Sequence, residues 1–82
     1  MSKIDKIIAR LKSRPKDFTW DELTRVMFHF GYTQLEGGGS RVKFFHKDKM
    51  SVFNLHRPHK PKILRGYQIK EALSRLETDG FI

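Results

Sequence analysis

The sequence predicts an α+β domain in the order α-α-β-β-β-α, with a three-stranded antiparallel sheet and the helices packed on one face of it. Two observations predict this fold. Apolar residues recur at intervals of three and four near both ends of the chain, whereas apolar and polar residues alternate across its middle. The length of 82 residues suits one domain with a small two-layer core. We therefore expect residues 1–82 to form a single domain.

Two helices are expected ahead of the sheet. The first covers residues 2–13, where Ser2 and Asp5 have the spacing of a capping box. The second begins at Thr19, which has the same relation to Glu22. Each helix has apolar side chains three and four positions apart, and these predict one buried face. The apolar face of the second helix consists of Leu23, Val26, Met27 and Phe30.

Three strands are expected in the middle of the chain. Residues 32–36 form a short first strand, and residues 41–46 and 50–56 alternate apolar with polar side chains. The polar residues 47–49 between the last two runs are few enough to close a β-hairpin. The alternation predicts that one face of this hairpin packs against the helices and the other faces solvent.

The final helix is expected from Tyr67 to about Thr78, where apolar residues again follow the helical period. Gly31 and Gly80 follow the second and the last helix. Glycine adopts the left-handed conformation without strain, so we expect both residues to end their helices.

Positive charge is concentrated in the 25 residues from Arg41 to Arg65. Eight of the 17 Lys and Arg residues and one acid, Asp48, lie here, and eight cations less one acid leave +7 of the formal net charge of +8. This density predicts binding of a polyanion, with nucleic acid the leading candidate. The alternative is a solvated face whose edge lysines discourage aggregation. The eight cations are Arg41, Lys43, Lys47, Lys49, Arg57, Lys60, Lys62 and Arg65.

Three further residues are candidates for contact with RNA. Phe45 shares one face of its strand with Arg41 and Lys43, so we expect it to be exposed and able to stack on a base. Gly39 and Ser40 belong to a glycine-rich turn whose amides are suited to binding a phosphate. A flexible joint between two strands has the same composition, and this alternative stays open.

Two histidines, His56 and His59, stand at the end of the third strand and are candidates for catalysis. Imidazole titrates near neutral pH, so it takes up and returns a proton within one cycle. RNA carries its own nucleophile, the 2′-hydroxyl, and one histidine among cations would therefore cleave it without a metal. The alternative is a loop in which one histidine hydrogen-bonds the backbone and the other binds phosphate. His29 and His46 are expected to be structural.

No metal or cofactor is expected. His56-x-x-His59 lacks a third ligand at a recognisable spacing, and the surrounding cations oppose a divalent ion. The absence of cysteine excludes disulfides and cysteine-based zinc sites. No apolar run approaches the ~20 residues of a membrane span, and the first residues lack the apolar stretch of a signal peptide. We therefore expect no membrane association and a cytoplasmic location.

The chain resembles the HicA toxin family of bacterial type II toxin–antitoxin systems. The resemblance rests on the basic hairpin with its strand-end histidines, the turn Gly39-Ser40, and the segment Arg65-Gly66-Tyr67-Gln68-Ile69. It spans about residues 20–82, so residues 1–16 look like an N-terminal helical extension. The resemblance implies a fold like that of a double-stranded-RNA-binding domain, which agrees with the order of elements predicted from periodicity.

The resemblance also implies metal-independent cleavage of mRNA by a catalytic histidine, and neutralisation by a HicB-like antitoxin. Most members of the family carry the histidine directly after the Gly-Ser turn, where this chain has Arg41. Two outcomes follow from this departure. Either His56 or His59 has taken over proton transfer, or this member binds RNA or its antitoxin and cuts poorly.

The predicted function is that of an mRNA interferase. Arg41, Lys43 and Arg57 would hold backbone phosphates, and His59 or His56 would activate the 2′-hydroxyl, leaving a 2′,3′-cyclic phosphate and a 5′-hydroxyl. One alternative is a non-catalytic RNA- or DNA-binding module. Another is an interaction domain whose basic face docks an acidic partner such as an antitoxin.

Overall fold

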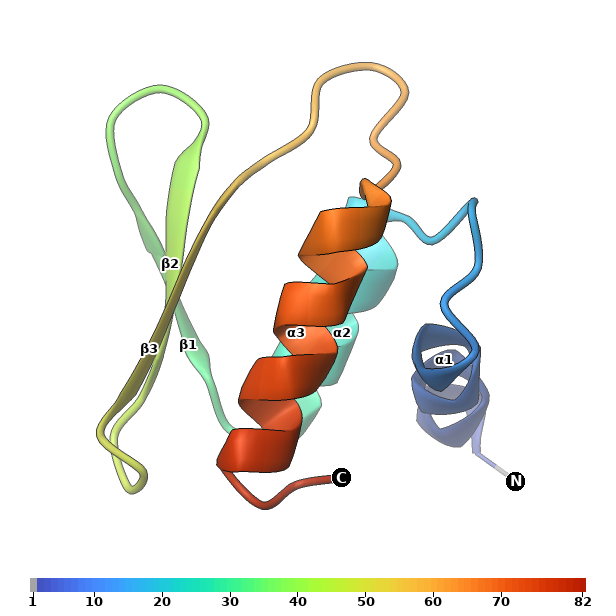
Figure 1. Cartoon of the computed structure of the whole chain (residues 1–82). Coiled ribbons are helices and arrows are strands. Elements are labelled where there is room, and N and C mark those ends of the chain that lie inside the picture. Colours follow the sequence, from blue (N-terminus) through green and yellow to red (C-terminus); the bar gives the residue numbers. More distant parts are fainter. Residues whose placement is uncertain (1) are drawn as a thin grey trace.

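The computed structural model describes residues 2–82, and in these residues three helices and three strands follow one another in the predicted order (Figure 1). The elements are α1 (Lys3–Lys12), α2 (Trp20–His29), β1 (Thr33–Glu36), β2 (Arg41–His46), β3 (Ser51–His56) and α3 (Gly66–Thr78). The predicted α+β class is confirmed. Within residues 2–82, no helix has the length and apolar character needed to cross a membrane.

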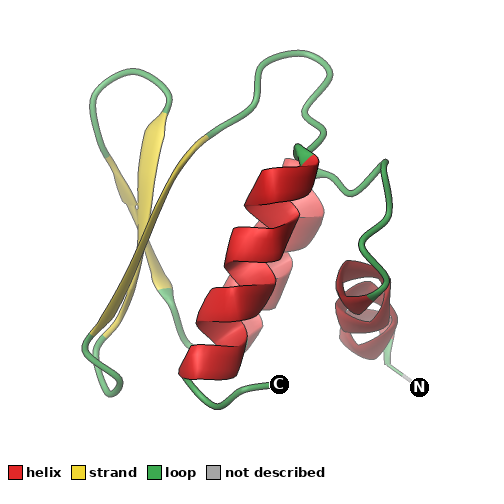
Figure 2. Cartoon of the chain, in the orientation of Figure 1, coloured by secondary structure: helices red, strands yellow, loops and turns green. Residues whose placement is uncertain are grey.

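The strands form one antiparallel sheet in the order β1-β2-β3, with β2 in the centre. Figure 2 shows the strands together on one side of the helices. Strands β2 and β3 pair along their whole length, from Arg41 opposite His56 to His46 opposite Ser51. Successive side chains of a strand point to opposite faces. One face of the sheet meets the helices, and among residues 2–82 no helix covers the other face (Figure 1).

The helices cover the sheet in two tiers. Helix α2 packs against β1 and α3 against β3, while α1 packs against α2 and α3 on the side away from the sheet (Figure 1). Ile7 and Leu11 of α1 are buried in these contacts. The predicted packing of helices on one face of the sheet is confirmed, and α1 forms its outer layer.

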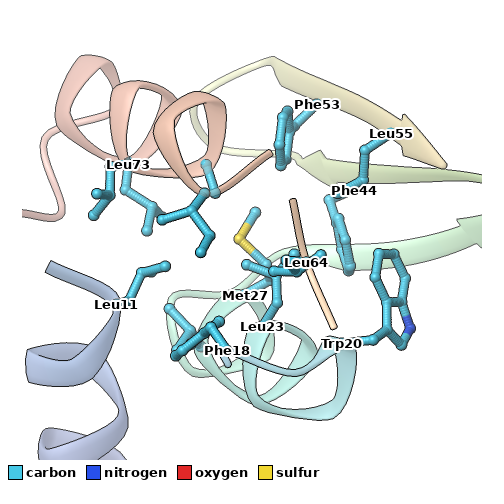
Figure 3. Close-up of a cluster of buried hydrophobic side chains, with 14 of the residues drawn as sticks. Leu11, Phe18, Trp20, Leu23, Met27, Phe44, Phe53, Leu55, Leu64 and Leu73 are labelled. Carbon is cyan, nitrogen blue, oxygen red and sulfur yellow. The ribbon is translucent and has the colours of Figure 1, made fainter. Parts of the chain in front are cut away.

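Apolar side chains from all three helices, β2, β3 and the connections meet in one core (Figure 3). Phe44 and Phe53 face one another across the β2–β3 register, and both are buried, as the alternation predicts. Burial of such side chains supplies most of the driving force for folding. Those labelled in Figure 3 are Leu11, Phe18, Trp20, Leu23, Met27, Phe44, Phe53, Leu55, Leu64 and Leu73.

Local signals set the ends of the first two helices as predicted. Asp5 N–H donates to Ser2 Oγ (3.3 Å) and Glu22 N–H donates to Thr19 Oγ1 (3.2 Å), so both capping boxes are present. These side chains accept bonds from amides that have no acceptor within the helix. Gly31 has a φ of 95°, the left-handed conformation that ends α2.

Two strand boundaries differ from the prediction. The sequence predicts Met50 in the third strand, but Met50 has a φ of 48° and donates its N–H to Lys47 O (3.3 Å), which closes the turn. A left-handed residue does not continue a strand, so β3 begins at Ser51. Tyr32, predicted in the first strand, precedes it because its N–H donates to Met27 O (3.0 Å).

Candidate nucleic-acid site at one end of the hairpin

The candidate site lies at the end of the sheet where β2 begins and β3 ends. Arg41 and His56 stand opposite one another there, and both are exposed on the face turned away from the helices. The β1–β2 turn, the β3–α3 connection and the start of α3 lie at this same end of the molecule (Figure 1). Segments that are distant in the sequence therefore meet around His56.

Three hydrogen bonds hold His56 and the backbone beside it, and a fourth holds Gln68, one of its partners. Ser40 Oγ lies 3.3 Å from His56 Nδ1, and Arg57 N–H donates to Ser40 O (2.7 Å). On the other side, Gln68 Nε2 donates to His56 O (2.9 Å), and Gln68 Oε1 accepts from Arg65 N–H (3.0 Å). His56 is thereby tied to the glycine-rich turn and also to the first turn of α3.

Gln68 belongs to the site although it was not among the site residues predicted from the sequence. Its side chain is 3 % exposed, and its two polar atoms join α3 to the end of β3. Gln68 stands three residues after Arg65, which is the position of the Glu or Gln in a capping box. That spacing could have predicted the bond between Gln68 and Arg65, but it carries no information about the bond between Gln68 and His56.

Two surface hollows meet at His56. One, of about 690 Å³, lies on the outer face of the sheet, and the other, of about 440 Å³, lies between the end of β3 and the start of α3. The first is bordered by Leu35, Gly37, Arg41, Lys43, Asn54 and His56 among others. The second is bordered by Ser40, His56, His59, Lys60, Arg65 and Tyr67 among others.

The structure brings the two candidate catalytic histidines together. His56 and His59 border the same hollow, with Lys60 and Arg65 beside them, and all four residues are exposed. Lys62 is exposed on the same connection. His56 is anchored by the contacts described above, whereas within residues 2–82 no side-chain hydrogen bond anchors His59.

Arg57 is engaged within the protein. Its Nη2 atom lies 2.5 Å from Glu36 Oε1, and its guanidinium carbon lies 5.6 Å from the centroid of the Trp20 ring. Trp20 is buried at the start of α2. Arg57 therefore braces the end of β3 against β1 and α2, and a phosphate would have to compete with Glu36 for it.

The glycine-rich turn has a defined shape. Gly37 N–H donates to Arg41 O (2.8 Å) and Arg41 N–H donates to Gly38 O (3.2 Å). A Cβ atom at Gly37 would lie 3.0 Å from Cβ of Arg41, and Gly39 has a φ of 63°. The amides of Gly39 and Ser40 donate to no backbone acceptor within residues 2–82. These two amides and the exposed Arg41 side chain are hydrogen-bond donors of the kind that bind phosphate.

The other predicted RNA-binding residues lie farther from His56. Lys47 and Lys49 follow the opposite end of β2, and a strand of this length spans roughly 20 Å. Lys49 Nζ lies 5.5 Å from the centroid of the Phe81 ring. Phe45 is half-buried on the outer face opposite Val52, near the same far end.

The remaining histidines lie outside the site. His46 is buried, and its Nε2 atom lies 2.9 Å from Phe30 O, which agrees with the structural role expected for it. His29 is exposed, and its ring meets that of Phe30 edge to face at 5.1 Å. Within residues 2–82, no group of three His, Cys, Asp or Glu side chains is placed to hold a metal ion.

The fold and the site define a class of protein: a small α+β domain, like a double-stranded-RNA-binding domain, with a cationic site at one end of its sheet. A family model described as HicA toxin of bacterial toxin-antitoxin matches residues 20–78, which include every element from α2 to α3. The chain therefore belongs to the HicA toxin family of toxin–antitoxin systems. Comparisons with curated proteins and with solved structures gave no match.

Proposed function

We propose that this chain is an endoribonuclease toxin that cleaves mRNA without a metal, with His56 as the general base, and that a HicB-like antitoxin neutralises it. Membership of the HicA family supports a toxin with RNA as its substrate. The observation that carries the mechanism is the placement of His56 and His59 in one hollow with Lys60 and Arg65.

His56 suits the role of base better than His59 because it is held in place. A general base must be positioned within hydrogen-bonding reach of the proton that it removes. When His56 Nδ1–H donates to Ser40 Oγ, the Nε2 atom presents its lone pair away from the turn. The bond from Gln68 to His56 O holds the backbone below the ring.

The proposed reaction uses both histidines. His56 Nε2 takes the proton of the 2′-hydroxyl, and the 2′ oxygen attacks the adjacent phosphorus. The bond from phosphorus to the 5′ oxygen breaks, and protonated His59 gives its proton to that oxygen. The products are a 2′,3′-cyclic phosphate and a 5′-hydroxyl. Arg41 and Lys43, which share the outer face with His56, would stabilise the negative charge of the transition state.

The remaining cations would extend the contact along the RNA backbone. Lys60, Lys62 and Arg65 continue from the hollow, whereas Lys47 and Lys49 would contact RNA only at the far end of the sheet. Arg57 would contribute less than predicted from the sequence because Glu36 already binds it. Contacts of this kind position a nucleic acid without selecting its sequence.

Arg41 favours a second candidate function. It occupies the place where, by the resemblance, most family members carry their histidine. A chain with a cation there would hold phosphate strongly and transfer protons poorly, which describes a non-catalytic RNA-binding module of the same fold. The same cationic end would also dock an acidic protein partner such as the antitoxin.

Cleavage of a short RNA by purified protein in excess EDTA separates these functions. We expect the wild type to cut and to leave a 2′,3′-cyclic phosphate, identified by mass spectrometry. His56→Ala should reduce the rate by at least about 100-fold while RNA binding is retained. His59→Ala should also slow cleavage, and His29→Ala is the matched control because His29 is exposed away from the site.

Each result decides between the candidates. Cleavage by His56→Ala at the wild-type rate would remove His56 from the mechanism. Cleavage that is lost in EDTA would contradict a metal-free reaction. Intact RNA in every lane, with binding retained, would establish the binding module instead.

A further inference from the structure

Tyr67 is a large aromatic residue that the core does not use. Its side chain is 58 % exposed in the first turn of α3, although burial of a tyrosine would contribute to stability. It borders the hollow that contains His56 and His59. Phe28, at 52 %, is comparably exposed, but it lies on α2 and borders neither hollow at His56.

The position of Tyr67 relative to His56 is set by its neighbour in the helix. Gln68 is buried and donates to His56 O, and it also accepts from Arg65 N–H. The first turn of α3 is thus attached directly to the end of β3. The Tyr67 side chain therefore starts from a fixed position at the edge of the hollow that His56 also borders.

The charges around Tyr67 match a nucleotide. Lys60 and Arg65 border the same hollow and provide cationic groups for phosphate, while the Tyr67 ring provides a flat apolar surface. Aromatic rings interleaved with cations are the common way in which proteins bind single-stranded nucleic acid, because every base has a face on which to stack. A base within a duplex is already stacked on its neighbours and does not present that face.

We infer that Tyr67 is the base-stacking residue of this site, so that the site takes an unpaired nucleotide of single-stranded RNA next to the phosphate at His56. The inference rests on the proposed function for the position of that phosphate. It replaces Phe45, the aromatic residue chosen from the sequence, which is half-buried near the other end of the sheet.

The inference is tested with a fluorescein-labelled 2′-O-methyl RNA 12-mer, which lacks the nucleophile and therefore reports binding without cleavage. We expect Tyr67→Ala to weaken binding about tenfold and Tyr67→Phe to retain it, because one stacked base is lost in the first variant only. Phe28→Ala is the matched control, and we expect it to bind as the wild type does. Thermal melting should show that all three variants fold.

Single abasic substitutions along the 12-mer locate the stacked base. At one position, loss of the base should weaken binding to the wild type about tenfold and leave the already weakened binding to Tyr67→Ala unchanged. A competing 12-bp RNA duplex should bind wild type and Tyr67→Ala equally. Losses that simply add at every position, or Tyr67→Ala binding within twofold of wild type, would overturn the inference.

The outcomes also separate the inference from the proposed function. If the wild type cuts no RNA but the abasic effect depends on Tyr67, the stacking role stands and cleavage is rejected. If cleavage depends on His56 while Tyr67→Ala binds and cuts like the wild type, stacking is rejected and cleavage stands.

Discussion

The histidines at the two ends of the β2–β3 hairpin have opposite environments. At the turn end, His46 is 7 % exposed and has partners at both ring nitrogens: Nε2 lies 2.9 Å from Phe30 O, and Lys49 N–H donates to Nδ1 (3.3 Å). The centroid of its ring also lies 5.0 Å from the ring centroids of both Tyr32 and Phe81. Nothing in this arrangement leaves a nitrogen accessible to a substrate.

A buried polar pair, Tyr32 and Asp79, lies near His46 at the turn end of the hairpin. The Tyr32 hydroxyl donates to the Asp79 carboxylate, and both residues are buried. Burial, together with the hydrogen bond and the negative charge of Asp79, raises the pKa of Tyr32. The phenol therefore stays protonated and keeps donating, which joins the start of β1 to the end of α3.

At the other end, His56 is exposed and has one nitrogen against Ser40, with cations on either side. The alternation of side chains between the two faces of a strand explains the difference. His46 is on the inward-facing set of β2, and His56 is on the outward-facing set of β3. The face and the partners of each histidine therefore suit His46 to packing and support the chemical role proposed for His56, and the following predictions test that difference.

Replacing each histidine by alanine should give the largest difference in stability between the two ends. We expect His46→Ala to destabilise the domain by about 3 kcal/mol, because it leaves a cavity and an unpaired Phe30 carbonyl. His56→Ala should change stability by less than about 0.5 kcal/mol, since the side chain is exposed. Urea unfolding measures both. Equal losses of stability would contradict the assignment of His46 to packing and His56 to chemistry.

The glycines at the two ends provide the next test. Gly31 has a φ of 95°, and an added Cβ would lie 3.1 Å from His46 Nε2, so Gly31→Ala should cost about 2 kcal/mol. Gly39 also has a positive φ, but open space surrounds it, so Gly39→Ala should cost about 1 kcal/mol. Urea midpoints compare the two. A larger loss of stability in Gly39→Ala would show that the backbone of the glycine-rich turn is more constrained than that at Gly31.

Ser40 should act as a positioning residue for His56. We expect Ser40→Ala to lower kcat for RNA cleavage about five- to tenfold with KM unchanged, because one hydrogen bond to the ring is lost. Ser40→Thr keeps a hydroxyl and should restore most of the rate. A rise in KM without a fall in kcat would instead assign Ser40 to phosphate binding.

Cations at the two ends should differ in their contribution to RNA binding. Arg41→Ala should weaken binding and reduce the slope of log K against log salt by about one, because one phosphate contact is removed. Lys49→Ala is the matched control, since Lys49 stands at the far end of the sheet beside Phe81. Fluorescence anisotropy at several salt concentrations gives both slopes. An equal reduction of the slope in the two variants would show that RNA contacts both ends of the sheet.

The smallest effect is expected at the ion pair beside the site. Glu36→Gln releases Arg57 and should lower stability by less than about 1 kcal/mol, because exposed ion pairs contribute little. The released guanidinium should strengthen RNA binding slightly. Arg57→Gln is the matched variant, and it should not strengthen binding. Weaker RNA binding in Glu36→Gln would show that the brace itself shapes the site.

Much of the fold followed from local signals in the sequence. The capping pairs Ser2–Asp5 and Thr19–Glu22 occur as predicted, because a cap depends on residues only three positions apart. The alternation in β2 and β3 correctly assigned side chains to the inner and outer faces. Met50 was placed in a strand wrongly, because its left-handed backbone belongs to the turn and leaves no mark in a pattern of apolar residues.

The site itself was predicted only in part. The sequence alone determined that cations and histidines are concentrated in residues 41–65. It also determined that buried and exposed residues alternate along the two strands of the hairpin. Only the tertiary structure decided that Ser40 meets His56, that Gln68 joins α3 to β3, and that Glu36 binds Arg57. The partners in these contacts are 16, 12 and 21 residues apart. Such contacts depend on how the strands pair and on how α3 packs against the sheet, and local periodicity does not specify which of the side chains will meet.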